Sequence, residues 1–191
     1  MASRVGAKPK ATYEDLVGLP GHLVGEILGG ELHVSPRPSA SHALAASTLQ
    51  SDLGTTFQRG RGGPGGWWIL SEPELHLGED VAVPDLAGWR RDRLPRVPDA
   101  PFLTLVPDWV CEVVSPSTER IDRVRKLPLY AREGVRYAWL VNPKTRTLEV
   151  FRNEGTRWVL LASHADDAQV RAEPFEAVEL DLLALWGDER T

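Results

Sequence analysis

The stretch that decides the fold reads PDWVCEVVSPST and occupies residues 107–118. Its first half is apolar and rich in valine, which is typical of a buried β-strand, and Ser117 or Thr118 can cap a helix that follows. Glu112 lies in the middle of the apolar run. A carboxylate in such surroundings is costly to remove from water unless a partner compensates for its charge, so we expect this side chain to have a function.

A second run, VPDLAGW at residues 83–89, has the same character. It places Asp85 near the start of another strand-like segment, predicted to extend from Ala82 to Trp89. Two carboxylates on neighbouring strands can bind a hard divalent cation, because such ions prefer oxygen ligands. A bound cation lowers the pKa of a water molecule and neutralises charge that develops on a phosphate. Asp85 and Glu112 are therefore candidate ligands of Mg²⁺ or Mn²⁺.

The segment after residue 118 places Asp122, Lys126 and Tyr130 at intervals of four residues. On a helix these side chains lie along one stripe, which is expected to turn Lys126 back toward Glu112. The ammonium would there orient a nucleophilic water or stabilise charge in a transition state. The same spacing is also typical of a surface ion pair between Asp122 and Lys126, so both interpretations are open. Pro128 has no amide hydrogen and predicts a kink in this helix.

Hydrophobic patterning predicts an α/β fold, with one domain at residues 12–191 after a disordered lead at residues 1–10. Helices are expected at residues 11–19, 42–58 and 117–133, the second of them capped by Ser41. Strands are expected at residues 22–28 and 31–34, which form a hairpin, and at residues 67–70, 74–77, 82–89, 108–114, 136–141, 147–152 and 157–162. Residues 59–66 and 90–106 are predicted loops, and residues 175–186 a strand or a short helix that closes the core.

The chain of 191 residues carries a formal net charge of −5. This value argues against broad, non-specific nucleic-acid binding, which usually needs a basic surface. Cys111 is the single cysteine and lies in an apolar run, which is consistent with a buried thiol and a reducing cytoplasm. No apolar run approaches the roughly 20 residues that span a bilayer, so no membrane partner is expected.

At these residues the sequence resembles the Uma2 family of bacterial proteins, whose members are expected to be endonucleases. The resemblance rests on blocks that occur in the family's order, at residues 26–32, 42, 83–86, 112–118, 122, 126, 130, 134–135 and 137–143. It implies the restriction-endonuclease-like fold of the PD-(D/E)xK superfamily, a central mixed sheet flanked by helices with a metal site at one end. In that superfamily a lysine usually stands two residues after the second acid, where this chain has Val114.

The resemblance implies Mg²⁺- or Mn²⁺-dependent hydrolysis of phosphodiester bonds in DNA. It assigns Asp85 and Glu112 as the metal-binding acids, and Lys126 as the lysine that acts from the following helix. Asn142 stands where the family usually has an aspartate, and we expect it to be a turn residue without a catalytic role. The supporting side chains implied for this site are Glu26 or Glu31, His42, Asp122 and Tyr130.

Two further features concern partners. The predicted loops contain arginines that are expected to contact DNA phosphates, namely Arg59, Arg61, Arg90, Arg91, Arg93 and Arg96. Trp67 and Trp68 are expected to be exposed and would suit a homodimer interface.

An alternative function is a catalytically inactive interaction module on the same fold, which the net charge and Val114 favour. The complete set of Asp85, Glu112 and Lys126 favours a nuclease, and metal binding would discriminate between the two.

Overall fold

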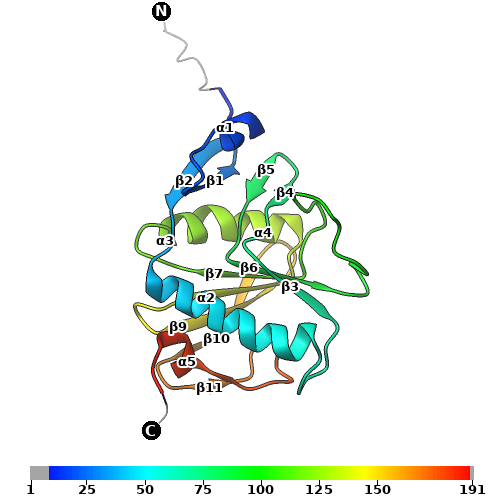
Figure 1. The fold of residues 1–191 in the computed structure, drawn as a ribbon, viewed down its shortest axis with the longest axis vertical. Coiled ribbons are helices and arrows are strands. Elements are labelled where there is room, and N and C mark those ends of the chain that lie inside the picture. The colour runs from blue at the N-terminus through cyan, green and yellow to red at the C-terminus, as the bar shows by residue number, and fades with distance from the viewer. Residues whose placement is uncertain (1–8, 190–191) are drawn as a thin grey trace, which may run out of the picture.

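The computed structural model describes residues 9–189, so most of the lead expected at residues 1–10 lies outside the described part. A large six-stranded sheet forms the centre of the molecule, with strand order β10-β9-β8-β7-β6-β3 (Figure 1). Its strands are β3 (Trp67–Ser71), β6 (Leu86–Arg90), β7 (Trp109–Val113), β8 (Tyr137–Asn142), β9 (Thr147–Asn153) and β10 (Trp158–Ala165). β7 and β8 run parallel and the other neighbours antiparallel, so the sheet is mixed, as the family resemblance implies.

A smaller sheet has strand order β2-β1-β5-β4. Its strands are β1 (Leu23–Leu28), β2 (Glu31–Pro36), β4 (Leu75–Leu77) and β5 (Asp80–Ala82). β1 and β2 form the predicted hairpin, because Gly29 and Gly30 both adopt the positive φ that a tight turn requires. The C-terminal region adds a separate pair of short strands, β11 (Gln169–Val170) and β12 (Leu180–Asp181).

The strand predicted over residues 82–89 is divided in the structure. β5 ends at Ala82 and pairs with β1 and β4 in the small sheet, whereas β6 begins at Leu86 and pairs with β3 and β7 in the large one. Pro84 lies between them and has no amide hydrogen for a ladder, which favours a break there. The chain therefore changes sheets at residues 83–85, and Asp85 lies where the two sheets meet.

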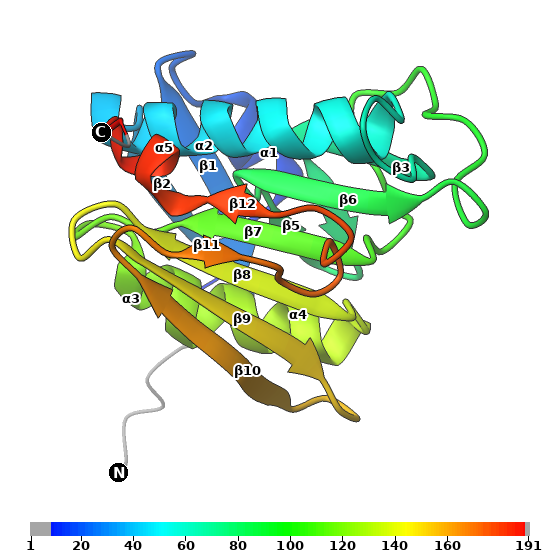
Figure 2. The ribbon, with the colours of Figure 1, turned by 90° about the horizontal axis from the view of Figure 1, so that it is seen from below.

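Helices cover both faces of the large sheet (Figure 2). One face carries α2 (Ala40–Leu53) and its π-helical extension η1 (Gly54–Gln58), and the other carries α3 (Glu119–Ile121), the π-helical turn η2 (Asp122–Lys126) and α4 (Leu127–Glu133). The remaining helices are α1 (Tyr13–Val17) and α5 (Leu182–Trp186). Within the described residues, no helix combines the length and the apolar character that a membrane span requires.

Two local details differ from the sequence prediction. The N-cap of α2 is Ser39 and not Ser41, because the Ser39 hydroxyl accepts a hydrogen bond from the amide of His42. Pro128 is accommodated in the helix by the wide turn η2, in which the Leu127 amide donates a hydrogen bond to the carbonyl of Asp122. This i→i−5 bond comes directly before the residue that has no amide to donate.

The apolar core lies on both faces of the large sheet. On the side of α2, Phe175 contacts Trp67 and Trp109 with ring centroids 4.9 Å and 5.0 Å apart. On the side of α4, Trp89 and Tyr130 are fully buried. Trp67 is only 5% exposed, so the expectation that it forms an exposed dimer surface is wrong. Its ring is needed to fill the space between the sheet and the C-terminal segment.

The turn between β8 and β9 agrees with the sequence prediction. The side-chain oxygen of Asn142 accepts hydrogen bonds from the amides of Lys144 and Thr145. An asparagine that binds the backbone two and three residues ahead is typical of a turn. Asn142 therefore has a local structural task.

Candidate functional site

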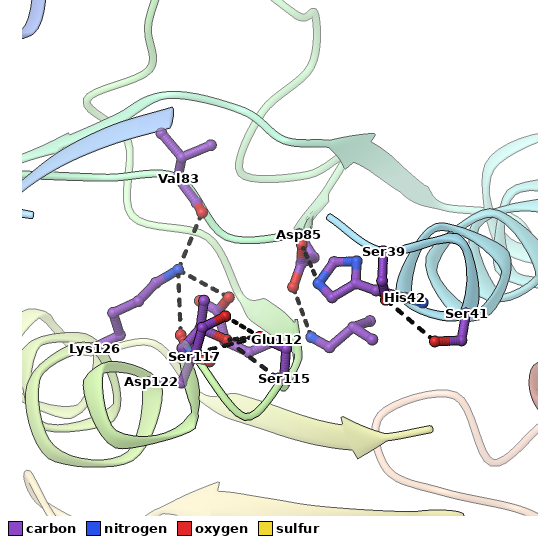
Figure 3. Close-up of polar contacts among 12 residues, drawn as sticks. Ser39, Ser41, His42, Val83, Asp85, Glu112, Ser115, Ser117, Asp122 and Lys126 are labelled. Atoms are coloured by element: carbon purple, nitrogen blue, oxygen red, sulfur yellow. Dashed lines mark hydrogen bonds and ion pairs between the residues drawn. The ribbon is translucent and has the colours of Figure 1, made fainter. Parts of the chain in front are cut away.

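A cavity of about 410 Å³ opens where the small sheet meets the large one. Three segments wall it: residues 35–39, which lead from β2 into α2, residues 83–85 between β5 and β6, and residues 115–118 between β7 and α3. Figure 3 shows the side chains that approach one another there from separate elements. The charged and titratable side chains that line the cavity include Glu26, His42, Asp85, Glu112, Asp122 and Lys126.

Lys126 is buried in this site and has several oxygen partners. Its Nζ lies 2.9 Å from Oε2 of Glu112 and 3.0 Å from Oε1 of Glu26, and it donates to the carbonyl of Val83 at 3.1 Å. Asp122 is farther away, at 3.8 Å. The side chain of Lys126 is 4% exposed, so the surface ion-pair interpretation is wrong. Burial lowers the pKa of this ammonium, but the negative groups around it, with Glu112 and Glu26 foremost, together raise it well above its usual value.

The direction of the side chains along β7 explains why a lysine from a helix can take the place of a lysine at position 114. Alternate residues of a strand face the same side, so Val110, Glu112 and Val114 all point toward α4. Val114 is 2% exposed and packs in the apolar core of that side. The helical segment that begins with η2 covers the same side. Lys126 is the last residue of η2, and its side chain reaches Glu112 from there.

Glu112 is held from two directions. Its Oε2 accepts a hydrogen bond from the ammonium of Lys126, and its Oε1 accepts a hydrogen bond of 2.7 Å from the hydroxyl of Tyr130. Burial raises the pKa of Glu112 well above its usual value, and the attraction of Lys126 opposes this only in part. Burial, followed by the charge of Glu112, also raises the pKa of the Tyr130 hydroxyl well above its usual range. The tyrosine therefore acts as a hydrogen-bond donor that fixes the orientation of the carboxylate.

Asp85 is fixed by the backbone of β7 and by the first turn of α2. Its Oδ2 accepts a hydrogen bond of 2.6 Å from the amide of Val113, and its Oδ1 lies 3.2 Å from Nε2 of His42. Burial lowers the pKa of His42, but the hydrogen bond to Asp85 and the charges of Asp85, Asp122 and Glu72 together raise it. Among the described residues, the buried Nδ1 of His42 has no hydrogen-bond partner.

The site contains more acidic than basic groups. Glu26, Asp85, Glu112 and Asp122 oppose the single ammonium of Lys126, with His42 beside them. Burial raises the pKa of Asp122 to about 6. A buried excess of carboxylates favours uptake of either a proton or a metal cation, because each relieves the repulsion between like charges.

The donor set fits a hard cation that retains much of its water. In the described part of the chain, no group of three or more His, Cys, Asp and Glu side chains is arranged as a metal cluster. Mg²⁺ does not need such a cluster, because it commonly uses one or two carboxylates and keeps several waters. Asp85 and Glu112 face one cavity and supply that minimum.

Comparison with known proteins decides the family. A family model named Uma2, with the description "Putative restriction endonuclease", matches residues 13–184. The chain belongs to the Uma2 family. It is also similar in structure to a putative nuclease belonging to DUF820 from Anabaena variabilis ATCC 29413, with a TM-score of 0.75 and 21% sequence identity. The alignment covers 93% of this chain and 98% of the other. No curated protein matches the chain.

These comparisons confirm the recognition of the family and the restriction-endonuclease-like fold. The matched range contains every residue that lines the cavity of this Uma2 protein. Family membership supports a nuclease-like function, whereas the metal and the substrate need evidence from the site itself. At 21% identity the similarity to the solved structure supports the fold alone.

The hairpin supplies one of its two candidate acids to the cavity. Glu31 pairs with Leu28, so it lies on the same hairpin face as Glu26 but nearer the turn. It lies 3.4 Å from Arg125 and is 62% exposed. Glu26 instead lies 3.0 Å from Lys126 and accepts a hydrogen bond from the amide of Val83. The structure therefore selects Glu26 and leaves Glu31 outside the cavity.

The arginine loops of this Uma2 protein lie away from the cavity. Arg59 follows the C-terminal end of η1, roughly 25 Å along the helix from His42. Arg90 is at the opposite end of β6 from Asp85, roughly 17 Å along the strand. Two of these arginines have structural partners, since Arg93 lies 2.9 Å from the buried Asp108 and Arg91 donates to the carbonyl of Gln58. None of Arg59, Arg61, Arg90, Arg91, Arg93 and Arg96 lines the cavity that the described residues form, and their contact with DNA phosphates stays a prediction.

Sequence reasoning missed the cavity rim. The residues are Ser35, Arg37, Ser39, Glu72, Ser115, Ser117 and the carbonyl of Val83. The motif SPRPS at residues 35–39 contained a usable signal. It places a cation between two prolines, directly before a helix cap, where the backbone has little freedom.

Proposed function

We propose that this Uma2 protein is a metal-dependent endonuclease that hydrolyses phosphodiester bonds in DNA. The observation that carries the proposal is the position of Lys126, a buried ammonium 2.9 Å from Glu112 in a cavity that Asp85 also lines. Burying a lysine costs free energy even when it is paired, so stability alone is a weak reason to place it there. An ammonium beside two carboxylates suits a reaction in which negative charge develops on a phosphate.

In this proposal Asp85 and Glu112 hold the metal ion, which when bound provides Lewis acidity and an activated water. Lys126 directs its ammonium toward the reacting phosphate and stabilises the charge of the transition state. Glu26 and Tyr130 keep Lys126 and Glu112 oriented through the contacts described above. His42 fixes the carboxylate of Asp85 and acts as a positioning residue.

A second candidate function is a catalytically inactive interaction module. One observation favours it, because both oxygens of Glu112 already have protein partners, Lys126 and Tyr130. In such a module the polar cluster would define the conformation of the hairpin and helix without binding metal. The two functions differ in whether Glu112 binds a divalent cation.

Glu112→Gln tests the endonuclease. The amide keeps the shape of the side chain but removes the charge that the metal ion needs. We expect metal-dependent cleavage of DNA to fall by roughly 100-fold or more, the scale of loss when one electrostatic group leaves an active site. Calorimetry with Mn²⁺ is expected to show weaker binding to this variant than to the wild type.

The matched control is Glu179→Gln, at an exposed carboxylate outside the cavity whose partner is Arg171. It is expected to retain both cleavage and Mn²⁺ affinity. Absence of cleavage by the wild type on single-stranded, duplex and branched DNA, together with equal Mn²⁺ affinity of wild type and Glu112→Gln, would establish the interaction module instead.

A further inference from the structure

The catalytic groups lie deep, at the base of a small cavity. The side chains of Glu112 and Lys126 are 3% and 4% exposed, and that of Asp85 is 18% exposed. The cavity volume of about 410 Å³ is in the range of a small-molecule pocket, about 300–1,000 Å³. A reacting phosphate must therefore enter between the walls formed by residues 35–39 and 115–118.

An intact duplex is poorly suited to such an entrance. Its phosphates follow a stiff helix with a persistence length of about 50 nm, so local bending toward a buried point costs free energy. Enzymes that act on a base inside a pocket solve a related problem by using single-stranded substrates or by extruding the nucleotide, at a cost of a few kcal/mol. A single strand can instead turn its backbone and place one phosphate in the cavity.

The charge at the cavity mouth also favours a small contact. Duplex binding usually involves many phosphates and a broad basic face, whereas this chain has a net charge of −5. Of the arginines in residues 9–189, Arg37 alone lines the cavity. It is exposed, and one of its nitrogens donates to the carbonyl of Gly21 at 3.3 Å. The hydroxyls of Ser39 and Ser117 lie on the same rim.

We propose that the substrate of this site is a flexible single strand of DNA, free or displaced from a duplex, and that Arg37 binds a phosphate next to the reacting one. This inference rests on the proposed endonuclease function and names its substrate class. Pro36 and Pro38 restrain the backbone on both sides of Arg37, and the hydrogen bond to the carbonyl of Gly21 holds its guanidinium at the rim before the strand arrives. The serine hydroxyls of the rim add neutral donors for the same backbone.

Cleavage of matched substrates tests the substrate class. An end-labelled oligonucleotide is offered as a single strand, as a blunt duplex of the same sequence and as a duplex with a single-stranded flap, each with Mg²⁺ or Mn²⁺. We expect the single strand and the flap to be cut at least about tenfold faster than the duplex, with the flap cut in its unpaired part. Equal or faster cleavage of the blunt duplex would overturn the proposal.

Binding measured by fluorescence anisotropy without metal tests the role of Arg37 separately from catalysis. Arg37→Gln removes the charge and retains a donor for the carbonyl of Gly21. We expect it to weaken binding of the single strand about tenfold, which corresponds to the loss of one charged hydrogen bond. It should also make the slope of log K against log salt less steep by about 0.7, the value for one phosphate contact on a single strand. Arg37→Lys is expected to restore most of the slope.

Arg157→Gln is the matched control, at an exposed arginine in the turn between β9 and β10. It should leave binding of the single strand unchanged. Tighter binding of duplex than of single strand, or an unchanged salt slope in Arg37→Gln, would overturn the proposal. If the single strand binds preferentially through Arg37 but no DNA form is cut with any metal, the endonuclease function fails while the substrate preference holds.

Discussion

At the scale of single residues, the pair Lys126–Glu112 shows how burial changes the value of a contact. The same two charges on the surface would stabilise the fold by about 0–1 kcal/mol. Here both side chains are almost fully buried, and the hydrogen bonds of Tyr130 and Val83 satisfy the remaining groups. Removing one partner therefore leaves a charge without water and without a counter-charge.

Lys126→Met is expected to destabilise the protein by about 3–5 kcal/mol at pH 8, because Glu112 remains as an uncompensated buried acid. Adding Glu112→Gln to this variant is expected to recover part of the loss, since the amide carries no charge. Urea unfolding of both variants and the wild type measures these differences. A cost below about 1 kcal/mol for Lys126→Met would mean that the pair is weak, as on a surface.

At the scale of elements, the wide turn η2 directs Asp122 and Lys126 into the cavity. Burial raises the pKa of Asp122 to about 6 from a usual value of 3.8. Between these two values the folded protein retains a proton that the unfolded chain has lost. Stability contributed by this group is therefore complete below pH 3.8, falls as the pH rises, and is lost above about pH 6.

Asp122→Asn is expected to remove this component of the pH dependence, because an amide does not titrate in this range. Relative to the wild type, the variant should gain stability between pH 4 and pH 7, by a total on the order of 3 kcal/mol. Urea unfolding at a series of pH values measures the change. If both proteins show parallel pH profiles, Asp122 does not retain its proton in the folded state.

At the scale of the whole molecule, the segment before β12 closes the core on the side of α2. Phe175 is fully buried and contacts four aromatic rings, including Phe57 at 4.7 Å and Trp139 at 5.6 Å. The cavity lies at the junction of the two sheets and does not include this residue. This aromatic part of the core is therefore separate from the cavity, and a change in it is expected to act on stability without touching the site.

Phe175→Ala is expected to cost about 3–5 kcal/mol, because a buried ring is lost and the rigid aromatic neighbours cannot close the space. Thermal or urea unfolding measures the loss, and the residual folded protein should retain its affinity for Mn²⁺. Val159→Ala, at a side chain on the exposed edge strand β10, is expected to change stability by no more than about 0.5 kcal/mol. Equal effects of the two substitutions would show that Phe175 does not close the core.

The sequence alone determined the features that local chemistry controls. The glycine turn of the hairpin, the existence of a helix from about residue 42 and the strand around Glu112 follow from φ preferences and apolar patterns within a few residues, although the sequence predicts the wrong serine as the cap of that helix. An acid inside an apolar run marked Glu112, and a lysine four residues after Asp122 marked Lys126. These signals are readable because each depends on neighbours along the chain.

Only the tertiary structure decided which of these groups share a site. The contacts that define the cavity join residues far apart in sequence, such as Asp85 with Val113 and Lys126 with Val83. The change of sheets at residues 83–85, the choice of Glu26 over Glu31 and the rim position of Arg37 all depend on such pairings. Local patterns do not specify them, because the free energy that selects one arrangement comes from packing and charge pairing across the whole fold.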